Sequence, residues 1–187
     1  MVQRSDLPAA GWKEQAEADR PDHETTWRAL AGCLGLGDLK QGDLGSATSP
    51  TYVTGLAEQV TATVEYADPT RVHAMAAAFA GDRFTSCAQQ AFAADLERNA
   101  PDGATVGDVT VARLDQPTLG QAMSASRASA TVMVGPIMVP IFTDFVAVFD
   151  GAAVSRLAFI DGGPGGGPFP ADLERSLVEK VVTRAGT

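Results

Sequence analysis

The sequence predicts an α+β fold in which helices pack against a mostly antiparallel sheet. Four strand-like runs follow one another after residue 104, at about 105–115, 121–134, 137–149 and 152–160. Their connections are as short as Asp150-Gly151, and short connections join antiparallel neighbours. Helical periodicity precedes and follows these runs, at about 24–34, 68–81, 85–99 and 171–184. This order predicts a C-terminal meander with helices packed on it as a sandwich.

The helices are predicted from their apolar spacing and from their ends. Trp27, Leu30 and Leu34 recur at helical spacing on one face of the first helix. The second helix begins at Asp68-Pro69, where an aspartate can cap free N–H groups and a proline suits the first turn. We therefore expect each helix to place one apolar stripe against the sheet.

The strand at 137–149 differs from the others because both of its faces are apolar. Ile141 and Phe145 lie on one face, and Phe142 and Val146 lie on the other. A strand at 58–67 instead alternates apolar with polar residues, which predicts one wet face. The 137–149 strand is therefore expected to be covered on both faces or to line a cavity.

Length and composition predict one domain. The chain has 187 residues, of which 45% are hydrophobic, enough for one substantial core. Residues 1–23 contain prolines, a glycine and many charges, and we interpret them as a tether or extended segment. Residues 24–187 then form a single domain.

The charge of the chain argues against two classes of partner. The formal net charge is −9, and the basic residues are scattered singly rather than gathered in a stripe. Nucleic acids and anionic lipid surfaces are therefore not expected as partners. The most apolar stretch, 132–149, is interrupted by Gly135, Pro136 and Asp144, so we also expect no membrane insertion.

Two cysteines, Cys33 and Cys87, are the only ones in the chain. Their spacing fits neither a CxxC redox pair nor a four-ligand zinc site. They either form a disulfide, which persists in an oxidising compartment, or are two buried free thiols of a cytosolic protein.

The glycine-rich stretch 160–174 has the order strand, loop and helix that phosphate-binding loops share. It lacks their chemistry, because Pro164, Pro168 and Pro170 have no N–H to donate. The stretch also contains no lysine or arginine, and the next basic residue is Arg175. The spacing is neither GxxxxGK[ST] nor GxGxxG. We interpret the stretch as a flexible connection and expect no nucleotide cofactor.

The sequence offers no recognisable catalytic or metal-binding motif. His23 and His73 lie in no metal-binding spacing. Ser124, Ser126 and Ser129 lie in a strand without a GxSxG elbow, and we interpret them as surface serines of the sheet. No catalytic, cofactor-binding or metal-binding residue is assigned.

Asp144 is a candidate functional residue, because burying a carboxylate among apolar neighbours without a partner costs much free energy. We expect this end of the strand to reach solvent, where Asp144 could meet Arg127. Asp144, Met138 and Phe142 are our candidates for a ligand site, in a pocket between the strand 138–148 and a covering helix.

Several short stretches together resemble a family of secreted or lipid-anchored actinobacterial domains of unknown function, similar in outline to the Mog1/PsbP-like α/β sandwich. The composition, rich in Ala, Gly and Arg and poor in Lys, suits a GC-rich actinobacterial genome. The stretches are "SDLPAAGW", "LAGCLG", "SPTY", "FTSCAQQAF", "DGATV" and "VPIFTDFV".

The resemblance implies an extracytoplasmic location and a Cys33–Cys87 disulfide, and it carries over no catalytic residue. Residues 1–6 contain neither the apolar stretch of a leader nor a lipobox cysteine, so we expect that a leader, with or without a lipid anchor, was removed.

The function that we expect from the sequence is a non-enzymatic domain of the cell envelope that binds a partner protein or a small ligand. A carrier of a small hydrophobic ligand is the alternative. A hydrolase with an unfamiliar site around Asp144 and His73 ranks last, and clustering of these two side chains would favour it.

Overall fold

The computed structural model describes residues 1–16, 23–37, 43–55, 58–163 and 166–186, and its architecture is α+β. One nine-stranded sheet has the order β1-β3-β4-β9-β8-β7-β5, with β2 paired to β4 and β6 paired to β7. The expected meander of antiparallel strands is confirmed, since β7, β8 and β9 pair in succession. The strands are β1 Lys13–Glu14, β2 Asp43–Thr48, β3 Tyr52–Thr54, β4 Glu58–Ala67, β5 Ala104–Val106, β6 Thr110–Arg113, β7 Ala122–Val134, β8 Ile137–Asp150 and β9 Ala153–Gly162.

All four predicted helices are present, within two residues of the expected ends. Asp68 caps the second one as expected, because its side chain accepts a hydrogen bond from the Thr70 backbone N–H at 2.8 Å. The helices are α1 His23–Leu34, α2 Pro69–Ala80, α3 Arg83–Asn99 and α4 Ala171–Ala185, and a short 3₁₀ helix spans Arg4–Asp6.

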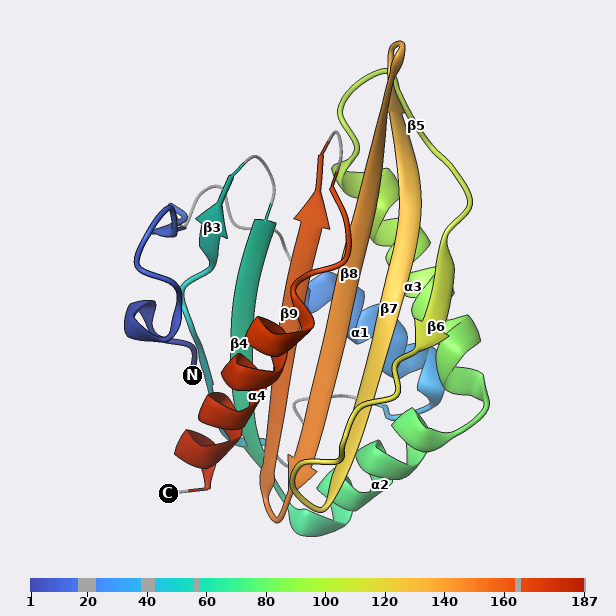
Figure 1. The fold of residues 1–187 in the computed structure, drawn as a ribbon. Coiled ribbons are helices and arrows are strands. Elements are labelled where there is room, and N and C mark those ends of the chain that lie inside the picture. The colour runs from blue at the N-terminus through green and yellow to red at the C-terminus, as the bar shows by residue number, and fades with distance from the viewer. Residues whose placement is uncertain (17–22, 38–42, 56–57, 164–165, 187) are drawn as a thin grey trace.

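The helices cover the two faces of the sheet unequally (Figure 1). Helices α1, α2 and α3 lie on one face, where Phe79 of α2 contacts Phe149 of β8 edge to face, with their ring centroids 5.5 Å apart. Helix α4 crosses the other face, where Leu177 and Val181 belong to the core. The sheet is thus the middle layer between two helical layers.

Strand β8 is covered on both faces over its second half, as its pattern predicts. Val146 and Val148 belong to the core under α4, whereas Ala147 and Phe149 belong to the core under the other three helices. The first residues of β8 project with the end of β7 beyond the rest of the sheet (Figure 1), and Met138 there is 64% exposed.

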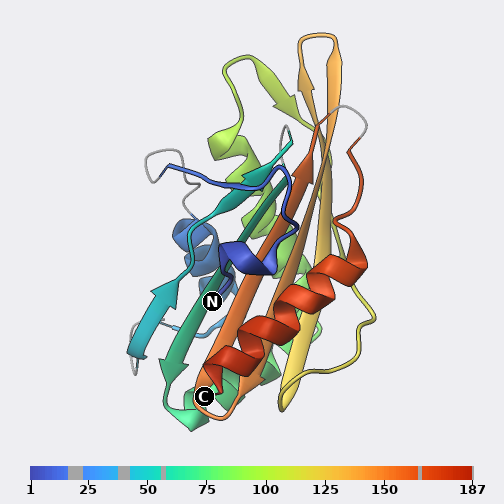
Figure 2. The same cartoon turned by 60° about the vertical axis from the view of Figure 1, so that its left-hand side comes forward.

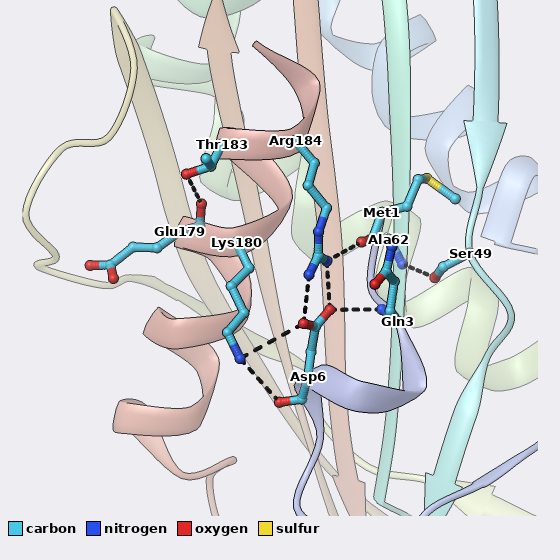
Figure 3. A network of polar contacts seen from close by, with 9 residues as sticks. All are labelled: Met1, Gln3, Asp6, Ser49, Ala62, Glu179, Lys180, Thr183 and Arg184. Atoms are coloured by element: carbon cyan, nitrogen blue, oxygen red, sulfur yellow. Dashed lines mark hydrogen bonds and ion pairs between the residues drawn. The ribbon is translucent and has the colours of Figure 1, made fainter. Parts of the chain in front are cut away.

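The N-terminal segment is part of the core, which corrects our interpretation of residues 1–23 as a tether. Val2, Leu7 and Trp12 are buried in the core cluster under α4. Figure 2 shows the N-terminal segment on the same face of the sheet as this helix. Arg184 of α4 donates two hydrogen bonds to the Asp6 carboxylate, at 2.6 and 2.7 Å (Figure 3). The many charged residues of this segment led to its interpretation as a tether, although three apolar residues bury it in the core. Residues 17–22 lie outside the described part.

Two further details differ from the sequence prediction. The run at 105–115 forms two separate strands, β5 and β6, rather than one. Strands β1, β2 and β3 were not predicted, because two of them have three residues or fewer and all six residues of β2 are exposed.

Candidate functional site

A cavity of about 220 Å³ lies between the sheet and the three helices α1, α2 and α3. Inward-facing residues of β4, β7, β8 and β9 form its floor, and side chains of the helices form its walls. The lining is mostly apolar and includes several aromatic rings. They belong to Trp27, Phe79, Phe84, Phe92 and Phe145.

The space exists because the sequence places small side chains where the two layers face each other. In one row across the sheet, Ala147 of β8 lies between Arg156 of β9 and Ser124 of β7. In the next row, Phe145 lies between Ala158 and Ser126. Helix α3 adds two alanines to the lining, at positions 88 and 91. Close packing across such a layer normally requires larger side chains.

Four buried polar atoms in the lining have no hydrogen-bond partner among the described residues. They are Trp27 Nε1, Ser124 Oγ, Thr143 Oγ1 and Arg156 Nε. Thr143 is 1% exposed and Ser124 is 7% exposed. A buried polar group without a partner costs about 1–3 kcal/mol, so native proteins contain few of them. Their gathering in one apolar cavity therefore identifies it as a candidate binding site.

Among the described residues of the lining, Arg156 alone carries a positive charge, and this charge is already compensated. Its guanidinium forms an ion pair with Glu65 of β4 and lies 4.1 Å from the centroid of the Trp27 ring. Burial lowers the pKa of Arg156 to about 10 and raises the pKa of Glu65. Arg156 therefore stays protonated at neutral pH. Its Nε–H is an unpaired donor in the cavity, while Glu65 balances its charge.

Two links fix the helices that cover the cavity. The Thr26 hydroxyl near the start of α1 donates a hydrogen bond to Asp95 of α3 at 2.5 Å. Near the other end of α1, Cys33 forms a disulfide with Cys87 of α3, with the Cα atoms 5.6 Å apart. The predicted disulfide is confirmed, and the alternative of two free thiols is wrong. Helices α1 and α3 are thus joined at two separated points above the sheet.

The expectation that Asp144 reaches solvent is wrong. Asp144 is 1% exposed, because α4 covers this part of β8 and brings Glu174 against it. Arg127, directly opposite on β7, donates two hydrogen bonds of 2.6 Å to its carboxylate. The partner was predicted correctly, but burial under a helix that comes later in the chain could not be inferred from the neighbours of Asp144 on its own strand.

A second buried carboxyl group, Glu174 of α4, lies beside Asp144 and is also 1% exposed. Gln116 donates a hydrogen bond of 2.6 Å to it. Burial, together with the neighbouring Asp144, raises the pKa of Glu174 to about 7, although the Gln116 hydrogen bond acts in the opposite direction. Since both carboxyl groups are enclosed, we interpret this cluster as a structural contact between α4 and the sheet.

The other sequence-predicted residues lie apart from the cavity. Met138 is exposed near the β7–β8 turn, and Phe142 lies on the same face of β8 as Asp144. None of the three candidate residues lines the cavity. A pocket does adjoin this strand, but it is lined by the alternate residues of β8, such as Ile141 and Thr143.

The clustering that would favour a hydrolase is not found. His73 is exposed on α2, which packs on the face of the sheet opposite to Asp144. Ser124 and Ser126 are buried and line the cavity, which corrects their interpretation as surface serines. The side chain of His23 lies outside the described part.

The stretch 160–174 connects β9 to α4, and its residues 164–165 lie outside the described part. Pro170 directly precedes α4, where its lack of an N–H removes one donor from the helix N-terminus. Two carboxylates, Asp172 and Glu174, occupy the first turn. The absence of a nucleotide site stays a prediction.

Neither a metal cluster nor a membrane-spanning helix is found among the described residues. In that part of the chain, no group of three or more His, Cys, Asp or Glu residues is placed to hold a metal ion. No helix there has both the length and the apolar character that crossing a membrane requires.

Comparison with protein-family models, curated proteins and solved structures finds no significant match to this chain.

Two features of the sequence relate to the cavity, although neither of them alone predicts it. Ser124 and Ser126 share the parity of Ala128 and Ala130, which belong to an inward-facing stripe of β7. Trp27 lies in the apolar stripe of α1, so its indole N–H is carried into the interior. Neither signal indicates a cavity until the register of β7 against β8 is known.

Proposed function

We propose that this protein is a non-enzymatic domain that binds a small, mostly apolar molecule with a polar group in the cavity between the sheet and helices α1 and α3. This is the ligand-binding form of the function expected from the sequence. The binding of a partner protein stays a separate prediction.

One observation carries the proposal: an apolar cavity is lined by four buried polar atoms that lack partners. Trp27 and Arg156 present N–H donors, and Ser124 and Thr143 present hydroxyl groups. Ligand sites typically combine an apolar lining with a few such groups, which fix the orientation of the ligand. A bound polar group near Ala147 would satisfy the nearest of these atoms, in Ser124 and Arg156, and recover the cost of burying them.

The size of the cavity limits the ligand. An engineered cavity of about 150 Å³ holds benzene. By that standard, the 220 Å³ of this cavity hold roughly nine or ten non-hydrogen atoms. A short chain or a substituted ring fits this volume, whereas a complete lipid tail does not.

We further propose that the protein works outside the cytoplasm as a ligand-binding or carrier domain of the cell envelope. The Cys33–Cys87 disulfide supports this location, because such bonds persist in oxidising compartments. The relationship to Mog1/PsbP-like sandwiches, the actinobacterial origin and a lipid anchor on a precursor belong to the same proposal.

The test uses four compounds of similar size: nonan-2-one, octanoate, octylammonium and nonane. The chain has two tryptophans, and Trp12 lies on the opposite face of the sheet. In a Trp12→Phe background, the fluorescence of Trp27 therefore reports on the cavity alone. We expect at least one compound to change this fluorescence saturably and to raise the melting temperature.

A matched pair of variants on α3 shows whether binding occurs in the cavity. Ala88 lines it, whereas Ala93 packs in the neighbouring apolar cluster on the same helix. Ala88→Leu should abolish the response, and Ala93→Leu should preserve it. A response to none of the four compounds, or equal responses in both variants, would contradict the proposed function.

A further inference from the structure

We infer that the polar group of the ligand is an uncharged hydrogen-bond acceptor, such as a ketone, ester or amide carbonyl. The inference rests on the proposed function and deepens it. It follows from the donors that the cavity presents and from the balance of charge around them.

The lining has more unpaired donors than acceptors. Trp27 Nε1 and Arg156 Nε can only donate, because neither nitrogen has a lone pair available to accept. The hydroxyl groups of Ser124 and Thr143 can donate as well as accept. A carbonyl oxygen, which accepts through two lone pairs, matches this set better than a donor-rich group such as an amine.

The register of the sheet locates the place for this acceptor. Arg156 and Ser124 lie on either side of Ala147 in the same row of the sheet. The methyl group of Ala147 does not fill the space between its neighbours, and Trp27 covers Arg156 from α1. A carbonyl above Ala147 therefore faces donors from both sides.

The charges of the surroundings disfavour an ionised ligand. Arg156 is already paired with Glu65, so a carboxylate would lose its hydration without gaining an unpaired cation. Asp95 also lines the cavity, but Thr26 and Arg98 already donate hydrogen bonds to its carboxylate, so it offers no unpaired anion to an ammonium group. An ammonium group would also face the unpaired donors of Trp27 and Arg156. An uncharged carbonyl avoids both penalties.

The remaining lining suits the rest of such a molecule. Ile141, Ile160 and Leu96 extend the apolar lining away from Arg156. Along β8, the row of Phe145 separates the row of Ala147 from the row of Thr143. The ligand class is therefore a small neutral amphiphile: an apolar chain or ring with a carbonyl.

The four compounds named above distinguish this inference from the proposed function. At pH 7, nonan-2-one should bind about tenfold or more tightly than octanoate, octylammonium or nonane. Lowering the pH toward 5 should strengthen the binding of octanoate, because more of it becomes the neutral acid, and should leave nonan-2-one unchanged. Octanoate or octylammonium binding as tightly as nonan-2-one at pH 7 would overturn the inference while supporting the proposed function.

Removing the Ser124 hydroxyl tests whether it contacts the ligand. Ser124→Ala should weaken nonan-2-one several-fold and leave the affinity for nonane unchanged. Thr143→Val, four residues from Ala147 along β8, and Ser129→Ala, on the opposite face of strand β7, are the controls and should change neither affinity. Equal affinities for nonan-2-one in Ser124→Ala and Ser129→Ala would overturn the inference.

Discussion

Arg127 of β7 and Asp144 of β8 lie directly opposite each other, and the guanidinium donates two hydrogen bonds of 2.6 Å to the carboxylate. Asp144 is 1% exposed, whereas the Arg127 side chain is 25% exposed. The carboxylate is thus the enclosed member of the pair, and its charge is held in the interior by this arginine.

We expect Asp144→Asn to lower the free energy of unfolding by about 3–5 kcal/mol, because it leaves the Arg127 charge without its buried partner. Denaturant melts at neutral pH measure the loss. Asp150→Asn, at the exposed end of the same strand, should change stability by no more than about 0.5 kcal/mol. A loss below about 1 kcal/mol for Asp144→Asn would contradict a buried pair.

Much of the fold could be predicted because its signals are local. The apolar stripes of the helices, the Asp68-Pro69 cap and the tight turn predicted at Asp150-Gly151 each depend on neighbours in the sequence. The two turn residues are Gly151 and Ala152, one position later than predicted, because Asp150 pairs with Ala153. The two apolar faces of β8 correctly indicated two covering layers.

The site could be predicted only in part, because it depends on contacts between distant segments. The buried state of Asp144 requires α4, and the cavity requires the register that places Ala147 between Arg156 and Ser124. The N-terminal anchors escaped prediction for the same reason, because Trp12 is buried by contact with Phe169, far along the chain. Local patterns do not contain these pairings.

The Cys33–Cys87 disulfide closes a loop with a sequence separation of 54 residues. In the chain-entropy estimate, its loss should lower stability by about 4 kcal/mol. Thiol titration of the denatured, unreduced protein should find no free cysteine, and reduction should lower the melting temperature. The doubly substituted Cys33→Ala, Cys87→Ala protein is the control, because reduction should not affect it. Two reactive thiols in protein made under oxidising conditions would contradict the bond and weaken the proposed location.

The Asp6–Arg184 contact joins the N-terminal segment to α4 (Figure 3). The hydrogen bonds from Arg184 hold the pKa of Asp6 below its usual value. The stabilisation is therefore present above about pH 4 and is lost as the pH falls through the lowered pKa. Asp6→Asn should cost about 1–3 kcal/mol at pH 7 and speed amide exchange in residues 1–14.

The difference between wild type and Asp6→Asn should shrink as the pH is lowered below about 4. The exposed Asp102 provides the control, since Asp102→Asn should leave both stability and exchange unchanged. Unchanged amide exchange in residues 1–14 of Asp6→Asn would show that this contact does not hold the segment.

Glu174 should make the protein less stable as the pH rises. Burial, together with the neighbouring Asp144, raises its pKa from 4.5 to about 7 in the folded protein. Between these two values the folded state binds more protons than the unfolded state, so the free energy of unfolding falls as the pH increases. The accumulated cost above pH 7 is about 2–3 kcal/mol.

Glu174→Gln removes the ionisation and keeps an oxygen that can accept from Gln116. We expect this variant to match wild type near pH 4.5 and to exceed its stability at pH 8, in denaturant melts across that range. Glu179→Gln, on the exposed face of the same helix, should follow the wild-type profile, because the Glu179 side chain is 47% exposed. If Glu174→Gln loses stability with pH as steeply as wild type does, the slope has another origin. Glu174 would then be ionised in the fold, and α4 would rest on a buried pair of charged carboxylates, with Arg127 beside Asp144 and Gln116 hydrogen-bonded to Glu174.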